Sequence, residues 1–187
     1  VINIVDSSNL DRNLYLAVQF LEMGIPVCIA LNMIDVAKKR GIEINAEKLS
    51  SLLGVPVIPT IARIGQGKTE LMESAAHIVQ ERKKFAALKI SYGDDVDRTM
   101  LDMEEEIATS GFLTDIYPVR WIALKYMEKD EQILSLGRKL NPELSAVLEE
   151  MVKKVSTHLL NTLDTYPEAM IAEQRYGYIN SILKQGV

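Results

Sequence analysis

Residues 27–31 form an uninterrupted apolar run between segments whose apolar residues recur with helical spacing. A strand that is apolar at every position is buried on both faces, which is typical of a parallel sheet covered by helices. Residues 1–5, where Asn3 is the one polar residue, and residues 55–59 also have the character of strands, and helical patterns separate the three segments. Because strands alternate with helices, we expect an α/β fold with three parallel strands in residues 1–92.

The second half of the chain has a different pattern, because β-branched runs are absent after Gly93 and amphipathic segments follow one another. The clearest segment opens at Asn141-Pro142, where Asn is a preferred capping residue and Pro fits the first helical position. Its apolar residues recur with the spacing of one helix face, at Leu144, Val147, Leu148, Met151, Val155, Leu159 and Leu163. We therefore expect a helical bundle in residues 93–187, so that the fold class is α/β followed by all-α.

The composition excludes several classes of protein. With 187 residues, 48% hydrophobic residues and a formal net charge of −5, the chain is globular and lacks the basic character of a nucleic-acid-binding protein. No apolar run approaches the roughly 18 residues of a membrane span, and the signal-peptide pattern is absent, so we expect this chain itself to be soluble. Cys28 is the only cysteine, which excludes an internal disulfide and is typical of a reducing compartment. Because the sequence opens directly on a strand, without Met, we expect that a preceding segment has been removed.

Two polar residues, Asn32 and Asp35, follow the apolar run at residues 27–31. Open α/β sheets bind ligands at the carboxyl ends of their strands. A fixed Asp carboxylate can accept hydrogen bonds from both N1–H and the 2-amino group of guanine, whereas adenine offers no such pair of donors. We therefore predict a guanine site at Asn32, Met33 and Asp35, with the Asn side chain bracing neighbouring loops. The alternative is purely local, since Asn and Asp are also preferred where a strand ends and a helix begins.

Residues 61–63 follow the next strand and form a second candidate segment. In GTPases a small-residue loop at this place directs a backbone N–H toward guanine O6, and Ala62 fits because only its backbone is needed. The aliphatic stem of Arg63 is long enough to lie over the base. Ile61 departs from the small hydroxyl residue that would support the Asp. We expect Ile61, Ala62 and Arg63 to complete the guanine site, with an ordinary strand-to-helix loop as the alternative.

Gly67-Lys68-Thr69 looks like the end of a phosphate loop, which would make the protein a diverged ATPase. The phosphate-loop pattern requires Gly where Ala62 stands, because the backbone there adopts conformations that a β-carbon penalises. Such a loop also normally follows the first strand of its domain, and this one follows the last. We therefore interpret Gly65 and Gly67 as turn residues.

The sequence predicts neither a catalytic residue nor a metal site. His77 and His158 have no second His or Cys at ligand spacing. Glu104, Glu105 and Glu106 are adjacent, so their side chains point in different directions on a helix and are expected to face solvent. The eight Met residues fall mostly on helical stripes and are expected to fill the core.

Three separated segments resemble the ferrous iron transport protein B (FeoB) family of bacterial membrane transporters, in the same order and over essentially the whole chain. Residues 5–16 resemble the segment that follows the family's second switch. Residues 31–35 have Met33 where most GTPases have Lys, as this family does. Residues 175–179, Arg-Tyr-Gly-Tyr-Ile, are similar to a motif that the family carries just before its membrane region.

The resemblance implies a cytoplasmic GTPase (G) domain and a helical domain of the guanine-nucleotide dissociation inhibitor (GDI) type, joined to a ferrous iron permease in the bacterial inner membrane. Residues 1–92 would hold the last three strands of a P-loop GTPase-type sheet, and residues 93–187 the helical domain. The partners would be the missing N-terminal half of the G domain and the permease of the same protein.

The resemblance also implies that the intact parent uses GTP and GDP with Mg²⁺. The phosphate loop, the switch Thr and the Asp-x-x-Gly segment of GTPases match nothing in this sequence, so we expect neither bound nucleotide nor hydrolysis from this chain alone. The main alternative is a non-enzymatic helical module that restrains a neighbouring domain. We also expect residues 1–5 to form an exposed sheet edge, which predicts a homo-oligomer or strand exchange.

Overall fold

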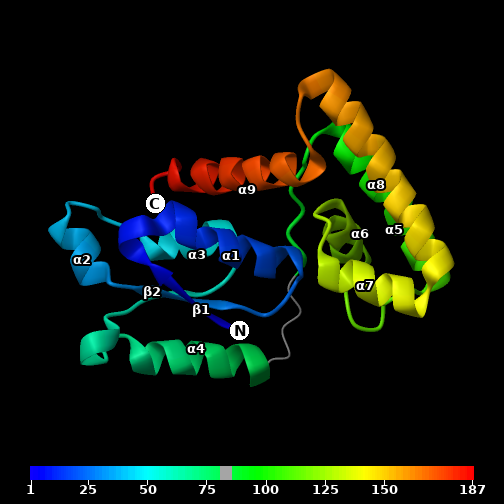
Figure 1. The fold of residues 1–187 in the computed structure, drawn as a ribbon. Coiled ribbons are helices and arrows are strands. Elements are labelled where there is room, and N and C mark those ends of the chain that lie inside the picture. The colour runs from blue at the N-terminus through cyan, green and yellow to red at the C-terminus, as the bar shows by residue number, and fades with distance from the viewer. Residues whose placement is uncertain (81–85) are drawn as a thin grey trace. The chain divides into compact units, whose positions relative to one another are not determined.

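The computed structural model describes residues 1–80 and 86–187 (Figure 1). The chain divides into two units by its internal contacts. Residues Val1–Lys89 and Arg175–Val187 make up the first, which we call the α/β unit, and residues Ile90–Gln174 make up the second, which we call the helical unit. That the functional domains meet between residues 92 and 93 stays a prediction.

The sheet of the α/β unit has three parallel strands, as predicted, in the order β1-β2-β3. The strands are β1 (Ile2–Asp6), β2 (Cys28–Asn32) and β3 (Val57–Pro59). The helices between and after them are α1 (Leu10–Glu22), α2 (Ile34–Lys39), α3 (Ala46–Leu53) and α4 (Lys68–Gln80), with short 3-10 turns η1 (Ser7–Asn9) and η2 (Ala62–Ile64). The sequence predicts this last helix from about residue 68 to residue 84, of which residues 81–84 lie outside the described part of the chain.

Burial explains the placement of the strands. Strand β2 is covered on both faces, and its Ile29 and Leu31 are fully buried. Strand β1 is covered on one face only, since Val5 is fully buried whereas Ile4 is 67% exposed. Cys28 in β2 is also buried, with its sulfur 3.8 Å from the hydroxyl of Ser74 in α4. The apolar run therefore builds the centre of the described sheet, and β1 forms one edge.

The helical unit confirms the predicted change of pattern after Gly93. Its helices are α5 (Asp94–Ser110), α6 (Val119–Met127), α7 (Glu131–Leu140), α8 (Pro142–Leu163) and the first part of α9 (Pro167–Leu183). Helix α8 begins as predicted, with the Asn141 side chain accepting from the Leu144 amide at 3.1 Å and Pro142 in the first turn. The predicted core role of Met100 and Met103 is also confirmed, because both are fully buried. No helix in residues 1–80 and 86–187 is long and apolar enough to cross a membrane.

Candidate functional site

The turn after β2 places Asn32 and Asp35 at the carboxyl end of the strand. Met33 has φ 63° and ψ 29°, a left-handed conformation that a residue with a β-carbon rarely adopts. Helix α2 starts at the next residue, so Asp35 lies in its first turn. The sequence thus folds here as a sharp strand-to-helix turn that holds both polar side chains beside the same end of the sheet.

Asn32 joins the ends of all three strands. Its side-chain oxygen accepts a hydrogen bond from the Ala62 amide at 3.0 Å and from the Thr60 hydroxyl at 3.4 Å, both after β3. Its backbone carbonyl accepts from the hydroxyl of Ser7, directly after β1. The Ala62 N–H, which we expected to face guanine O6, is therefore engaged by Asn32 in this structure.

Asp35 forms an ion pair with Arg63. The guanidinium Nη2 lies 3.0 Å from the carboxylate Oδ2, and the side chains of Arg63 and Asp35 are 70% and 19% exposed. The hydrogen bond from Arg63 holds the pKa of Asp35 below its ordinary value. We expected the stem of Arg63 to cover a base, but its guanidinium instead occupies one oxygen of the carboxylate that would bind that base.

The loop that follows β3 is fixed by its own backbone. Ile61 is buried, and its amide donates to the Gln66 carbonyl at 3.1 Å, which forms an antiparallel bridge across the loop. Ile61 lacks the hydroxyl expected at its position, and the neighbouring Thr60 supplies one to Asn32 instead. The structure thus brings Asn32, Asp35, Ala62 and Arg63 together, while the buried side chain and the backbone of Ile61 hold the loop in place.

Two residues of this site, Ser7 and Thr60, were not predicted. Both are small hydroxyl residues just beyond a strand end, and both contact Asn32. The position of Thr60, one place before the expected hydroxyl, was the only signal in the sequence that could have identified it. Ser7 gave no signal, because its role depends on the pairing of β1 with β2.

The Gly67-Lys68-Thr69 segment has a structural explanation. Gly67 has φ +78°, and a β-carbon at this residue would lie 2.2 Å from the Pro59 carbonyl oxygen. Lys68 and Thr69 form the first turn of α4. The glycine is therefore needed for close packing of the loop against the end of β3, which supports its interpretation as a turn residue.

The described residues contain no group of three or more His, Cys, Asp or Glu side chains that could hold a metal ion. Glu104 pairs with Arg120, whose Nη1 lies 3.1 Å from the Glu104 Oε1. His158 lies 3.4 Å from the Asp95 carboxylate on the surface of the helical unit. The side chains of Glu104 and Arg120 are only 23% and 20% exposed, so Glu104 is less open to solvent than expected, whereas His158 and Asp95 are surface residues.

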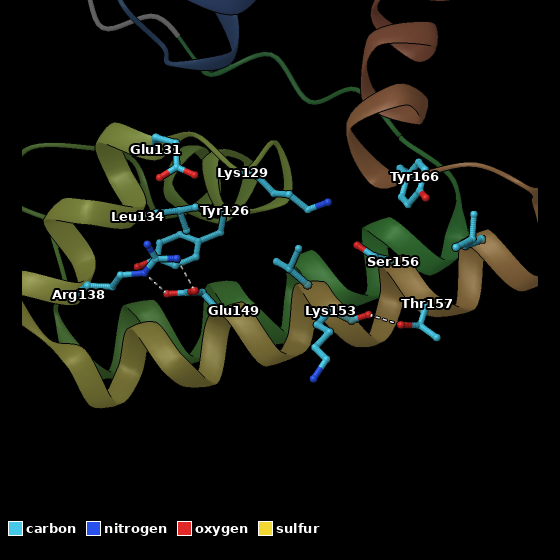
Figure 2. A pocket seen from close by; sticks show the side chains of 12 residues that line it. Tyr126, Lys129, Glu131, Leu134, Arg138, Glu149, Lys153, Ser156, Thr157 and Tyr166 are labelled. Atoms are coloured by element: carbon cyan, nitrogen blue, oxygen red, sulfur yellow. Dashed lines mark hydrogen bonds and ion pairs between the residues drawn. The ribbon is translucent and has the colours of Figure 1, made fainter.

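The helical unit contains a pocket of about 350 Å³, and Figure 2 shows the side chains that line it. Arg138 donates from Nε and Nη2 to the two carboxylate oxygens of Glu149, at 2.9 and 2.7 Å. This hydrogen bonding lowers the pKa of Glu149. Lys129 and Lys153, which also line the pocket, pair with Glu168 and Glu150. Because each of these cations already has a carboxylate partner, the pocket offers a ligand little charge. We assign no ligand to this pocket.

Comparison with known proteins gives the same family for both units. Residues 1–75 match the family "Ferrous iron transport protein B", and residues 92–187 match "FeoB cytosolic helical domain". The chain is 35% identical to the Fe(2+) transport protein A/Fe(2+) transporter FeoB fusion protein of Porphyromonas gingivalis. That match covers 99% of this chain and 22% of the relative, so the chain spans about a fifth of the relative's length.

Solved structures confirm the fold. The cytosolic domain of the T. maritima FeoB iron transporter in its GMPPNP form is 30% identical with a TM-score of 0.75, over 99% of this chain and 66% of that chain. A mutant of NFeoB from S. thermophilus bound to GDP is 32% identical with a TM-score of 0.78, over 98% of this chain and 67% of that chain. Both similar proteins thus carry a guanine nucleotide or its analogue.

Proposed function

Because this chain belongs to the ferrous iron transport protein B (FeoB) family, we propose that it is part of a GTP-dependent ferrous iron transporter and carries its guanine-recognition segments. The carrying observation is the 3.0 Å hydrogen bond from the Ala62 amide to Asn32, which holds the two candidate segments together beside Asp35. The guanine nucleotides in the solved relatives support this proposal. The site consists of Asn32, Met33, Asp35 and residues 61–63.

In this proposal each residue has a distinct role. Asp35 accepts from N1–H and the 2-amino group of guanine, because an Asp carboxylate is ionised at neutral pH and offers two acceptor oxygens. Asn32 does not contact the base but positions the loop of Ala62. Arg63 must release the Oδ2 atom of Asp35 when guanine binds, and its stem then lies beside the base.

We further propose that residues 1–92 complete a G domain only together with a preceding segment of the parent. The 187 residues contain neither a phosphate loop of the pattern G-x-x-x-x-G-K-S/T nor an Asp-x-x-Gly segment. Backbone amides, a Lys and Mg²⁺ around the phosphates supply nearly all of phosphoryl-transfer catalysis. This chain alone therefore does not hydrolyse GTP, and Mg²⁺ is held by residues outside it.

Residues 93–187 are, in this proposal, the helical domain that follows the G domain on the cytoplasmic face of the bacterial inner membrane. The partners of the chain are then the rest of its own G domain and the iron permease. The match of residues 92–187 to the FeoB cytosolic helical domain supports this assignment.

The test is Asp35→Asn in the full-length parent. The substitution exchanges one acceptor for a donor, so GTP affinity should fall about 100-fold while xanthosine triphosphate gains affinity, because a mismatched polar group in such a site costs a few kcal/mol. Competition binding with the two nucleotides measures the change.

Glu43→Gln is the matched control, since it also neutralises a carboxylate of the α/β unit, here an exposed one, and should leave both affinities unchanged. An unaltered preference for GTP in Asp35→Asn would remove the guanine assignment.

A further inference from the structure

An almost fully buried arginine joins the two sequence segments that make up the α/β unit. Arg175 in α9 is 1% exposed, and Glu22 at the end of α1 is 5% exposed. The guanidinium Nε and Nη2 lie 2.9 and 2.8 Å from the Glu22 Oε2. The two residues are 153 positions apart, and both belong to the α/β unit.

Helix α1 makes a second contact with the guanidinium, through Tyr15. The Nη1 atom donates to the Tyr15 hydroxyl at 3.2 Å, and the central carbon lies 5.5 Å from the centre of the Tyr15 ring. The next residue, Tyr176, places its own ring 5.0 Å from that of Tyr15. A buried charge is tolerated only when it is paired and hydrogen-bonded, and α1 provides both to Arg175.

Beyond Arg175, α9 continues to bury one face. Ile179 and Ile182 are buried, and they follow Arg175 at intervals of four and three, so the three side chains lie on one side of the helix. The start of α9 has a different partner, because Glu168 pairs with Lys129 within the helical unit at 3.0 Å. The helix therefore changes units along its length, at about Arg175.

We propose that residues 175–187 are a structural part of the α/β unit, fastened to α1 by Arg175, and that the helical unit is inserted between the two segments of the α/β unit. This assignment differs from the family match, which places residues 92–187 together in the helical domain, and it removes residues 175–187 from the helical domain proposed above. One consequence rests on the proposed function: a membrane region after residue 187 would be attached to the guanine-binding unit, and α1 and α9 would transmit its movements directly.

The test is hydrogen exchange in Arg175→Met, which removes the guanidinium from the buried Glu22 carboxylate. The amides of Ile29 and Leu31 in β2 should exchange about 100-fold faster, because breaking one side of a buried ion pair is strongly destabilising. The amides of residues 178–183 should accelerate equally. Trp121 in α6 is the only tryptophan, and its fluorescence reports the helical unit, whose denaturant midpoint should stay unchanged.

Two further variants make the result decisive. Glu22→Met combined with Arg175→Met removes both charges and should restore exchange in β2 to within about tenfold of wild type, since an apolar pair can replace a buried ion pair. Arg138→Met breaks an exposed ion pair of the helical unit and should leave β2 exchange unchanged.

The proposal is overturned if Arg175→Met accelerates exchange in α8 but not in β2. Should Arg175→Met fail to fold, the double variant decides: residues 178–183 must then exchange together with β2, and exchange together with α8 overturns the proposal. None of these measurements involves nucleotide, so they remain valid whether or not Asp35 binds guanine.

Discussion

Asp35 and Arg63 form an ion pair where the sequence predicts a base contact. Because the Arg63 side chain is largely exposed, solvent screens the ion pair, which therefore contributes little to stability. A base that offers two donors to the same carboxylate can therefore displace the guanidinium at small cost. The ion pair is therefore compatible with the proposed role of Asp35.

Arg63→Ala should raise the pKa of Asp35 toward its ordinary value, since the hydrogen bond from Arg63 is the largest cause of its depression. A carboxyl group whose pKa is lowered by folding stabilises the protein above its unfolded pKa, and this contribution is lost as the pH falls through the folded pKa. The stability of the variant should therefore depend less on pH in the acid range than that of the wild type. Carboxyl-carbon NMR titration measures the pKa directly.

Arg40→Ala serves as the control, because it removes an exposed arginine at the end of the same helix that carries Asp35. An Asp35 pKa that is equal in wild type and in Arg63→Ala would show that the ion pair does not form in solution.

At the residue scale, sequence patterns identify residue types but not partners. Asn32 and Asp35 were predicted because Asn-x-x-Asp after an apolar run has a chemical meaning. The engagement of the Ala62 amide by Asn32, and of Asp35 by Arg63, could not be predicted, since both depend on how two loops far apart in the sequence meet. Ser7 was missed for the same reason.

At the scale of elements, the loop between β3 and α4 depends on one close approach. The loop is closed by the bridge between Ile61 and Gln66, and Gly67 then passes directly over the Pro59 carbonyl. Both Gly65 and Gly67 have positive φ, but only at Gly67 would an added β-carbon meet other atoms within 4 Å. Substituting Ala at each glycine in turn therefore distinguishes the destabilisation caused by backbone strain from that caused by a steric clash.

Gly67→Ala should destabilise the α/β unit by about 3 kcal/mol, because a left-handed conformation and an overlap with the Pro59 oxygen both penalise the added methyl group. Gly65→Ala should cost only about 1 kcal/mol, since nothing lies within 4 Å of its added β-carbon. Urea denaturation followed by circular dichroism measures both. Equal losses in the two variants would contradict the packing role of Gly67.

The order of the elements was predictable because hydrophobic periodicity changes from strand to helix along the chain. Element ends were less predictable. Strand β3 was expected from residue 55 but begins at Val57, although the Pro56 carbonyl already accepts from the Ile29 amide. The role of α9 was not predicted at all, because the burial of Arg175 depends on α1, at the opposite end of the sequence.

At the scale of the whole molecule, β1 presents an apolar edge within the described sheet. Ile2 and Ile4 are exposed, and a hollow of about 200 Å³ beside them is also lined by Ala30 and Leu71. Exposed apolar edges pair with other strands. In the proposed parent this edge receives the preceding part of the G domain, and in the isolated chain it is free to pair with a second copy.

Ile4→Lys should reduce self-association of the isolated chain, because a charge on an exposed strand opposes edge pairing. Light scattering over a range of concentrations measures the effect. Ile116→Lys changes an equally exposed isoleucine, also 67% accessible, in the helical unit and should have no effect. A wild-type chain that is monomeric at every concentration would contradict the prediction.

The isolated chain should bind GTP no more tightly than about 0.1 mM in calorimetry. Contacts to the base alone correspond to about −4 kcal/mol, or a Kd of roughly 1 mM. A micromolar isotherm would contradict this expectation. If that binding were also lost in Lys68→Ala and kept in Asp35→Asn, the phosphate-loop alternative at Gly67-Lys68-Thr69 would be correct.

The reactivity of the buried Cys28 thiol reports how often the α/β unit opens. Burial raises the pKa of this thiol, and in the closed strand no alkylating reagent can reach the sulfur. Alkylation of Cys28 therefore requires β2 to open. Because the chain has a single cysteine, each labelled molecule has opened at this strand, and the labelling rate measures the opening.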